Sequence, residues 1–173
     1  MADTAETAET DVLFQQAQAV VYRHEGGLVD NPNDPGGLTN LGISLRNHPS
    51  MTAEQIRGLT QQSADRIYYQ EYWKPWPWAQ MPKSICIKAY DASVVMGGKS
   101  AIIALQRALR ACGQKIPDDG EPGPITMTSI KAPLEIELLA ALRSELAAHF
   151  RLVAETRPSE AVFLGGWLAR AYE

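Results

Sequence analysis

The chain has 173 residues, of which 45% are hydrophobic and 21% are charged, a composition that excludes a disordered or collagen-like protein. Its 16 basic and 20 acidic side chains give a net charge of −4 and a pI near 5.4, which argues against a nucleic-acid-binding protein. The longest apolar runs are too short to span a bilayer. A chain of this length forms one compact domain or two small lobes.

The first eleven residues are acidic and contain no Lys or Arg, so they lack the basic start and apolar stretch of a secretory signal. We expect residues 1–11 to form a flexible tail, and the protein to be made in the cytoplasm without a classical signal peptide. Cys86 and Cys112 are far apart, and no Cys-x-x-Cys pair is present. The sequence therefore predicts no disulfide framework and no metal site.

The hydrophobic pattern is mostly helical, and pairs of Gly and Pro mark where helices end. A helix that starts near Val12 is expected to stop at Gly26-Gly27, and the residues that follow predict a loop with a small β-hairpin element near residues 27–44. Thr52 and Gln55 have the spacing of a capping box. Further helices are expected over residues 60–72, 84–96, 100–113 and 134–153, and after Pro158.

The Gly97-Gly98 pair divides the sequence into segments 12–96 and 97–173, which follow the tail. Each segment alone would have a thin core, so we expect the two to pack together as one compact unit.

Glu25 is the first candidate catalytic residue, because it stands at the expected end of a helix and just before two glycines. The negative end of the helix dipole disfavours a charged carboxylate there, and Val21 and Phe14 place apolar surface on the same side. Both effects favour the protonated carboxyl, which is the form that a general acid needs.

Asp34 and Thr39 are the second and third candidates, within a loop whose glycines allow a bulky substrate to come close. We expect Asp34 to be hydrated and ionised, and the hydroxyl of Thr39 to hold a water molecule. Two carboxyls in contrasting environments and a held water are the requirements for hydrolysis of a glycosidic bond. The same residues would also suit an ordinary helix end and an ordinary turn.

Six aromatic residues crowd eleven positions, and sugar rings stack on aromatic faces. Trp73 is expected in the core. Tyr72, Trp76 and Trp78 are candidate substrate-binding residues, although a Trp between prolines can equally pin a loop onto the core. Asn40 is a further candidate for substrate binding.

Several motifs resemble those of glycoside hydrolase family 108 and follow one another in the same order as in that family. Its members are the bacterial and phage N-acetylmuramidases that cut peptidoglycan. The strongest is the run EGGLVDNPNDPGGLTNLGIS over residues 25–44. Weaker similarities, which extend into the predicted peptidoglycan-binding domain of that family, are Tyr72-Trp73, residues 91–97, Leu105-Gln106, Asp119-Gly120, Gly123-Pro124, Thr126 and the Gly166-Trp167-Leu168-x-Arg170 run.

The resemblance implies a mainly α, lysozyme-like fold with two lobes around a cleft that holds Glu25 as the catalytic acid. It implies a muramidase segment over residues 12–96 and a peptidoglycan-binding segment over residues 97–173. Asp34 and Thr39 would position the attacking water, with the two carboxyls roughly 6.5–9.5 Å apart as in inverting enzymes. Val95 departs from the family pattern, which has asparagine there, and an apolar side chain cannot hydrogen-bond a sugar.

Peptidoglycan glycan strands are the expected substrate, reached in the periplasm or outside the cell, and no cofactor is needed. A holin, secretion machinery or an immunity protein would be the partners of an endolysin or a secreted effector. Three alternatives stay open: a lytic transglycosylase, a non-catalytic peptidoglycan-binding protein, and a structural protein of a phage particle or secretion machine.

Overall fold

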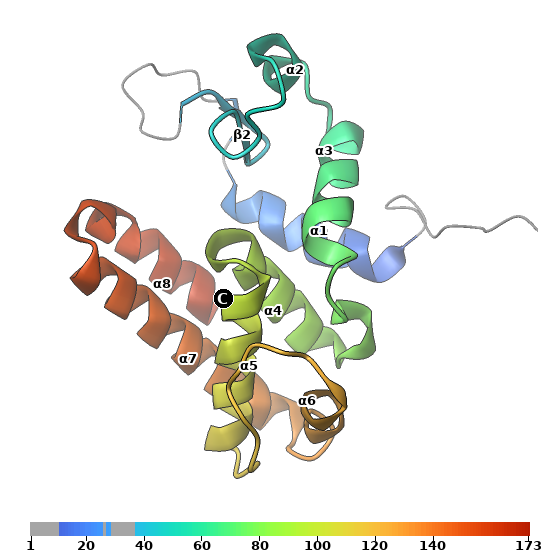
Figure 1. Ribbon diagram of the computed structural model, residues 1–173, viewed down its shortest axis with the longest axis vertical. Helices are drawn as coiled ribbons and strands as arrows, with labels where there is room; N and C mark the ends of the chain where they lie inside the picture. The colour runs from blue at the N-terminus through green and yellow to red at the C-terminus, as the bar shows by residue number, and fades with distance from the viewer. Residues whose placement is uncertain (1–10, 26, 29–36) are drawn as a thin grey trace, which may run out of the picture. The chain divides into compact units, whose positions relative to one another are not determined.

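The computed structural model describes residues 11–25, 27–28 and 37–173. Asp34, a candidate for catalysis, lies outside the described residues. The chain divides into two compact units, Met1–Lys74 and Pro75–Glu173. Both are mainly α-helical, and a small two-stranded sheet lies in the first (Figure 1). The prediction of a mainly α, lysozyme-like fold is confirmed at this level, whereas a cleft between two lobes stays a prediction.

In the first unit, helix α1 (Val12–His24) begins at Asp11. The Asp11 carboxylate accepts a hydrogen bond from the backbone N–H of Phe14 at 2.8 Å, which caps the helix. It also accepts one from the indole nitrogen of Trp73 at 2.8 Å, and the rings of Phe14 and Trp73 meet edge to face. Trp73 is only 4% exposed, so it is a core residue, as the sequence predicts.

The hairpin consists of β1 (Thr39–Asn40) and β2 (Ile43–Ser44), which pair antiparallel. Leu41 and Gly42 join them with φ of +52° and +78°, the left-handed values that a tight two-residue hairpin turn requires. The prediction of a small β element within residues 27–44 is therefore confirmed. Its paired residues are Thr39 with Ser44, and Asn40 with Ile43.

Two helices complete the first unit. Helix α2 (Ala53–Arg57) begins with the predicted capping box, in which the side chains of Thr52 and Gln55 each accept a hydrogen bond from the other residue's backbone N–H. Helix α3 (Gln61–Tyr68) continues into a π-helical turn, η1 (Tyr69–Trp73), so the predicted helix over residues 60–72 ends in a wider turn.

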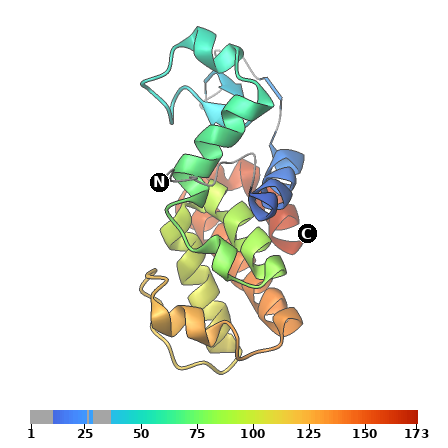
Figure 2. The ribbon, with the colours of Figure 1, turned by 90° about the vertical axis from the view of Figure 1, so that its right-hand side faces the viewer.

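Helix α7 (Glu135–Thr156) is central to the second unit, where it packs against α4, α5 and α8 (Figure 2). Its buried face carries Leu138, Leu142, Leu146 and Phe150, at the spacing of an amphipathic helix. The other elements of this unit are η2 (Trp78–Gln80), α4 (Lys83–Met96), α5 (Gly98–Ala111), α6 (Pro124–Ser129), η3 (Pro158–Phe163) and α8 (Leu164–Tyr172).

A buried ionic group joins α4 to α8. The guanidinium of Arg170 lies 2.8 Å from the Asp91 carboxylate, with side chains 8% and 1% exposed. The Lys88 ammonium donates to the backbone carbonyl of Arg170 at 2.8 Å. Burial lowers the pKa of Lys88, and the charge of Asp91 opposes that effect. Arg170 thus forms a buried salt bridge between the two helices.

One buried side chain shapes the loop between α5 and α6. Gln106 is fully buried, and its amide nitrogen lies 2.9–3.1 Å from the Asp119 carboxylate, the Glu121 carbonyl and the Thr126 hydroxyl. Its amide oxygen accepts a hydrogen bond from the backbone N–H of Gly120 at 2.8 Å. Gln106 therefore holds this loop from beneath, and Arg107 and Arg110 of the same helix hold it at the surface through Asp118.

The expected break at Gly97-Gly98 falls between α4 and α5, and both helices belong to the second unit. By compactness the chain divides after Lys74, and the division into functional segments 12–96 and 97–173 stays a prediction. Within the part of the chain that the structure describes, no helix has the length and apolar character needed to cross a membrane. The same residues contain no group of three or more His, Cys, Asp or Glu side chains that could hold a metal ion.

Candidate active site

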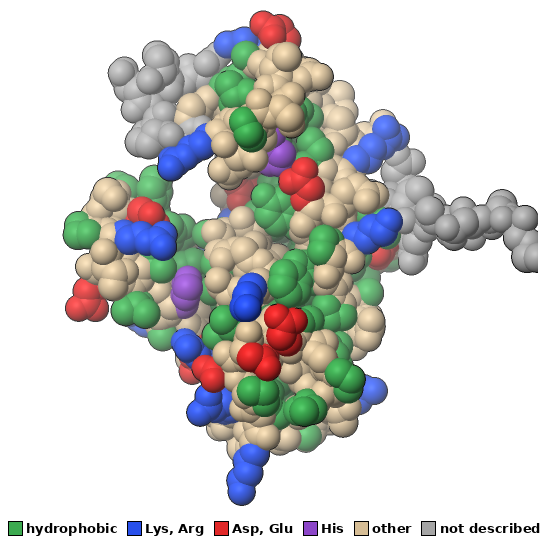
Figure 3. Space-filling model, viewed as in Figure 1, with side chains coloured by type: hydrophobic (Ala, Val, Ile, Leu, Met, Phe, Trp, Pro, Cys, Tyr) green, Lys and Arg blue, Asp and Glu red, His purple; other side chains and the backbone are tan. Residues whose placement is uncertain are grey.

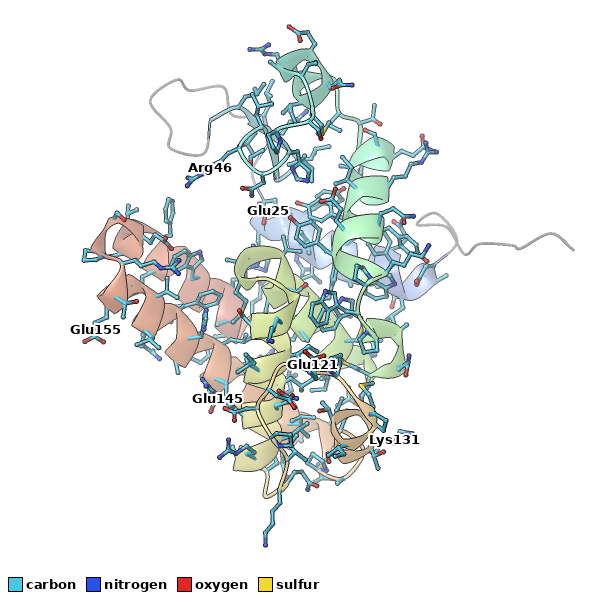
Figure 4. All side chains as sticks on the ribbon, in the orientation of Figure 1. Glu25, Arg46, Glu121, Lys131, Glu145 and Glu155 are labelled. Carbon is cyan, nitrogen blue, oxygen red and sulfur yellow. The ribbon has the colours of Figure 1, made fainter. Side chains whose placement is uncertain are left out.

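Glu25 occupies the position at which α1 ends. Its backbone turns from helical to extended, with φ −85° and ψ 135°, while its N–H still donates to the carbonyl of Val21 at 3.0 Å. The side chain is half-buried. Figure 4 shows Glu25 at the end of α1 that faces the hairpin. The end of the helix thus fixes the backbone of Glu25 and leaves part of its side chain exposed to solvent.

Gly42, in the hairpin turn, leaves the room that the Glu25 side chain occupies. A Cβ atom at Gly42 would lie 3.0 Å from Oε2 and 3.0 Å from Cγ of Glu25, and it would collide with the hydroxyl of Tyr68. The positive φ of Gly42 is also a conformation that other residues adopt at a cost. Both the turn and the position of Glu25 therefore require glycine here.

Three tyrosines from α1, α3 and η1 pack together near this carboxyl group. The Tyr68 hydroxyl donates to the carbonyl of Leu41 at 3.2 Å, which ties α3 to the hairpin. The Tyr68 ring meets the Tyr22 ring at a right angle and the Tyr72 ring at a centroid distance of 5.5 Å. The cluster forms an aromatic wall next to Glu25.

Two of these hydroxyls have a raised pKa. Burial and a hydrogen bond to the Asp65 carboxylate, 2.7 Å away, raise the pKa of Tyr22. Burial also raises the pKa of Tyr72, and the negative charges of Glu71 and Glu25 raise it further. Tyr72 therefore keeps its proton at neutral pH.

Thr39 and Asn40 lie on the first hairpin strand, and the structure gives them different surroundings. The half-buried Thr39 places its hydroxyl 3.4 Å from the carbonyl of Gly37. Asn40 is buried, and its amide nitrogen faces the carbonyls of Ile56, Arg57 and Leu59 at 3.0–3.4 Å. Asn40 therefore fastens the hairpin to the end of α2, and contact of Asn40 with substrate stays a prediction.

Trp76 and Trp78 belong to the second unit, where their rings stack with centroids 5.9 Å apart. Trp78 is fully buried, and a side chain with no exposed surface offers no face to a sugar ring. Trp78 is therefore a core residue, which is one of the two positions that the sequence left open. Trp76 is half-buried against Gly98, where any side chain would meet the indole ring. A saccharide contact by Trp76 stays a prediction.

The first unit thus brings Glu25, Thr39, Asn40 and Tyr72 onto or beside the hairpin. Sequence reasoning missed Tyr68 and Gly42, which fix the surroundings of Glu25. A signal for Tyr68 exists, because it lies four residues before Tyr72 and so shares one helical face with it.

Sequence reasoning also missed the buried His48. Its Nε2 lies 3.0 Å from the Glu71 carboxylate and its Nδ1 lies 3.2 Å from the carbonyl of Ser44. His48 therefore ties the hairpin to η1. His48 and Glu71 are 23 residues apart, so the sequence contains no local pattern that indicates their contact.

Comparison with known proteins agrees with these features. Residues 18–97 match the family Glycosyl hydrolase 108, and residues 100–172 match the family Predicted Peptidoglycan domain. The solved structure of Brucella abortus SagA is similar to this chain with a TM-score of 0.69 and 23% identity, over 91% of this chain and 92% of that one. At this identity the similarity establishes a shared fold. No curated protein sequence matches the chain.

The two matched segments follow one another and together include Glu25, the hairpin and all helices from α2 to α8. The match of residues 18–97 to the glycosyl hydrolase 108 family supports a glycoside hydrolase that acts on peptidoglycan, and the match of residues 100–172 supports a peptidoglycan-binding part.

Proposed function

We propose that the chain is an N-acetylmuramidase that hydrolyses the β-1,4 bond between N-acetylmuramic acid and N-acetylglucosamine, with Glu25 as the general acid. The observation that carries the proposal is the placement of the Glu25 carboxyl at a helix end, against Gly42 and beside the tyrosine wall. A half-buried carboxyl in fixed surroundings is suited to protonating a leaving group.

In this mechanism Glu25 gives its proton to the glycosidic oxygen while a water molecule attacks the anomeric carbon from the opposite face. Asp34 accepts a proton from that water, and the Thr39 hydroxyl holds it. The Thr39 hydroxyl hydrogen points toward the carbonyl of Gly37, which leaves the oxygen lone pairs to accept a hydrogen bond from water. The product would have inverted configuration at the anomeric carbon.

Glu25→Gln tests the role of the acid. The amide keeps the size of the side chain but has no proton to give at neutral pH, so the initial rate of peptidoglycan clearance should fall roughly 10²–10⁴-fold. Glu54→Gln is the matched control, because Glu54 belongs to the same unit and is exposed in α2. Clearance by purified Glu25→Gln at the parent rate would disprove the assignment.

The chemistry of the released fragments separates hydrolysis from its closest alternative. A hydrolase adds one water per bond cleaved, whereas a lytic transglycosylase forms an anhydro-muramic end with no added water. Mass spectrometry of the fragments should show the hydrated muramic end. Binding to peptidoglycan without release of reducing ends would point instead to a non-catalytic wall-binding protein.

We propose that the enzyme meets its substrate in the periplasm or outside the cell, which requires a delivery route. A holin gene beside this gene would indicate an endolysin, and an immunity gene would indicate an effector sent into rival cells. Reading the genomic neighbourhood distinguishes these routes without changing the proposed reaction.

A further inference from the structure

The second unit has a pocket of about 210 Å³ that the proposed reaction does not use. It lies where the ends of α4, α7 and η3 meet α8, and its walls include Val95, His149, Phe150, Arg157, Glu160 and Trp167. Figure 3 shows hydrophobic, basic and acidic side chains side by side over the joined ends of α7 and α8. The volume is below the roughly 300–1,000 Å³ typical of sites for drug-sized ligands, so it suits a single small group.

One side of the pocket is apolar. Trp167 stacks on Phe150 with ring centroids 5.4 Å apart and an interplanar angle of 25°, so one face of the indole is already occupied. Val95 adds an aliphatic surface to the same pocket. This side offers contact to a short hydrocarbon group rather than hydrogen bonds to sugar hydroxyls.

Two opposite charges border the pocket. The Arg157 guanidinium lies 3.4 Å from the Glu160 carboxylate, and the two side chains are 65% and 37% exposed. A guanidinium has five N–H donors and a carboxylate has two acceptor oxygens, so the loose contact between them leaves both able to bind a ligand. The pair therefore presents a cation and an anion within the width of one amino-acid head group.

The nearby histidine adds a neutral polar group. Burial lowers the pKa of His149, and the positive charges of Arg107 and Arg157 lower it further. The lowered pKa favours the uncharged imidazole, which donates a hydrogen bond from one ring nitrogen and accepts one at the other. The net charge at the pocket is then that of the Arg157–Glu160 pair, which is zero.

We propose that this pocket binds the zwitterionic amino-acid end of a peptidoglycan peptide stem. Arg157 would pair with the carboxylate, Glu160 with the ammonium group, and the aliphatic part would lie against Val95, Phe150 and Trp167. A neutral sugar ring has no charges to satisfy such a pair. The proposal rests on the proposed function in taking peptidoglycan as the polymer.

Titration with a soluble peptide tests the pocket without any measurement of activity. The probe is the tripeptide L-alanyl-γ-D-glutamyl-meso-diaminopimelate, added to the full chain while NMR follows the Trp167 indole signal, assigned with a Trp167→Phe variant. We expect a saturating shift in the parent chain. In Arg157→Gln and Glu160→Gln the dissociation constant should rise at least roughly tenfold, the effect of losing one charge-assisted contact.

Matched controls lie in the last turns of α7, just before Arg157, and do not line the pocket. Arg151→Gln and Glu155→Gln remove one exposed charge of each sign and should leave the dissociation constant within about twofold. The tripeptide acetylated only at the free amine of diaminopimelate should bind as weakly to the parent chain as the unmodified tripeptide binds to Glu160→Gln.

Four results would overturn the proposal: no saturating shift, equal loss in the control variants, undiminished binding of the acetylated tripeptide, or equal binding of a peptide-free disaccharide. Because the Glu25→Gln clearance assay is independent of this titration, failure of the pocket and failure of the proposed reaction can be told apart.

Discussion

The two units are stabilised in different ways. In the first, single polar side chains join short elements: Asn40 joins the hairpin to α2, His48 joins it to η1, and Tyr68 joins it to α3. In the second, long helices pack apolar faces around α7, with one ionic group buried between α4 and α8. The candidate acid thus lies in the unit whose geometry depends on individual hydrogen bonds, which makes that unit more sensitive to polar substitutions.

The largest loss of stability is expected at the buried ion pair of Asp91 and Arg170 in the second unit. Asp91→Asn removes a carboxylate and leaves the Arg170 guanidinium buried without its counter-charge, which should lower the free energy of unfolding by about 3–5 kcal/mol. Chemical denaturation of the full chain measures it. Asp118→Asn, at an exposed pair with Arg107 and Arg110, should cost much less. Equal losses would mean that burial of the pair is unimportant.

The next largest loss is expected at Gly42, which both adopts a left-handed backbone and leaves space for Tyr68 and Glu25. Gly42→Ala combines an unfavourable left-handed backbone with a collision with Tyr68 and Glu25, which should cost about 2–4 kcal/mol and most of the clearance activity. Gly37→Ala has the same backbone strain, with φ of +67°, but open space around the added methyl group. If Gly37→Ala loses as much activity as Gly42→Ala, the collision does not matter.

A smaller effect is expected at the join between the hairpin and α2. Asn40→Asp replaces an amide that donates to carbonyls with a carboxylate that they repel, at a cost of about 1–3 kcal/mol. Hydrogen exchange should accelerate in the hairpin and α2 while α7 keeps its protection. Asn47→Asp makes the same chemical change at an exposed position and serves as the control. Equal acceleration in α7 would show that the two units do not respond separately.

The smallest effect is a pH dependence in the second unit. The pKa of His149 is lowered in the folded chain, so the unfolded chain binds this proton more readily. The stability contribution is therefore complete above the ordinary histidine pKa of about 6.5 and is lost as pH falls below it. In denaturation measured from pH 8 to pH 5, His149→Gln should lose less stability than the parent chain.

A second variant checks the cause of that shift. Arg107→Gln removes one of the positive charges that disfavour protonation of His149, so its stability should also fall less steeply with acidification. A steeper fall than in the parent chain would show that Arg107 does not act on His149 in this way.

Local chemistry explains which parts of the fold the sequence predicted. Thr52 and Gln55 form the expected capping box because its partners are three residues apart, and the hairpin follows from the need for glycine in a tight turn. The contacts of Asn40, His48 and Gln106 were not predicted. Each joins residues 13 to 23 positions apart, and such pairs leave no periodic signal in a single sequence.

For the candidate site, the sequence located the Glu25 carboxyl, since a helix end followed by glycines is a local pattern. It did not find the residues that surround this carboxyl, because Tyr68 and Gly42 meet Glu25 only through the fold. Trp78 shows the opposite limit: its sequence neighbours left a substrate platform and a core role equally open, and only the packing places it in the core.

The support that Gln106 gives to the loop between α5 and α6 has a practical consequence for engineering. Because the internal amide of Gln106 holds the backbone of this loop, the exposed side chain of Glu121 carries little of its architecture. Glu121 is therefore a position at which a fluorophore or an affinity handle can be attached while the scaffold beneath keeps its shape.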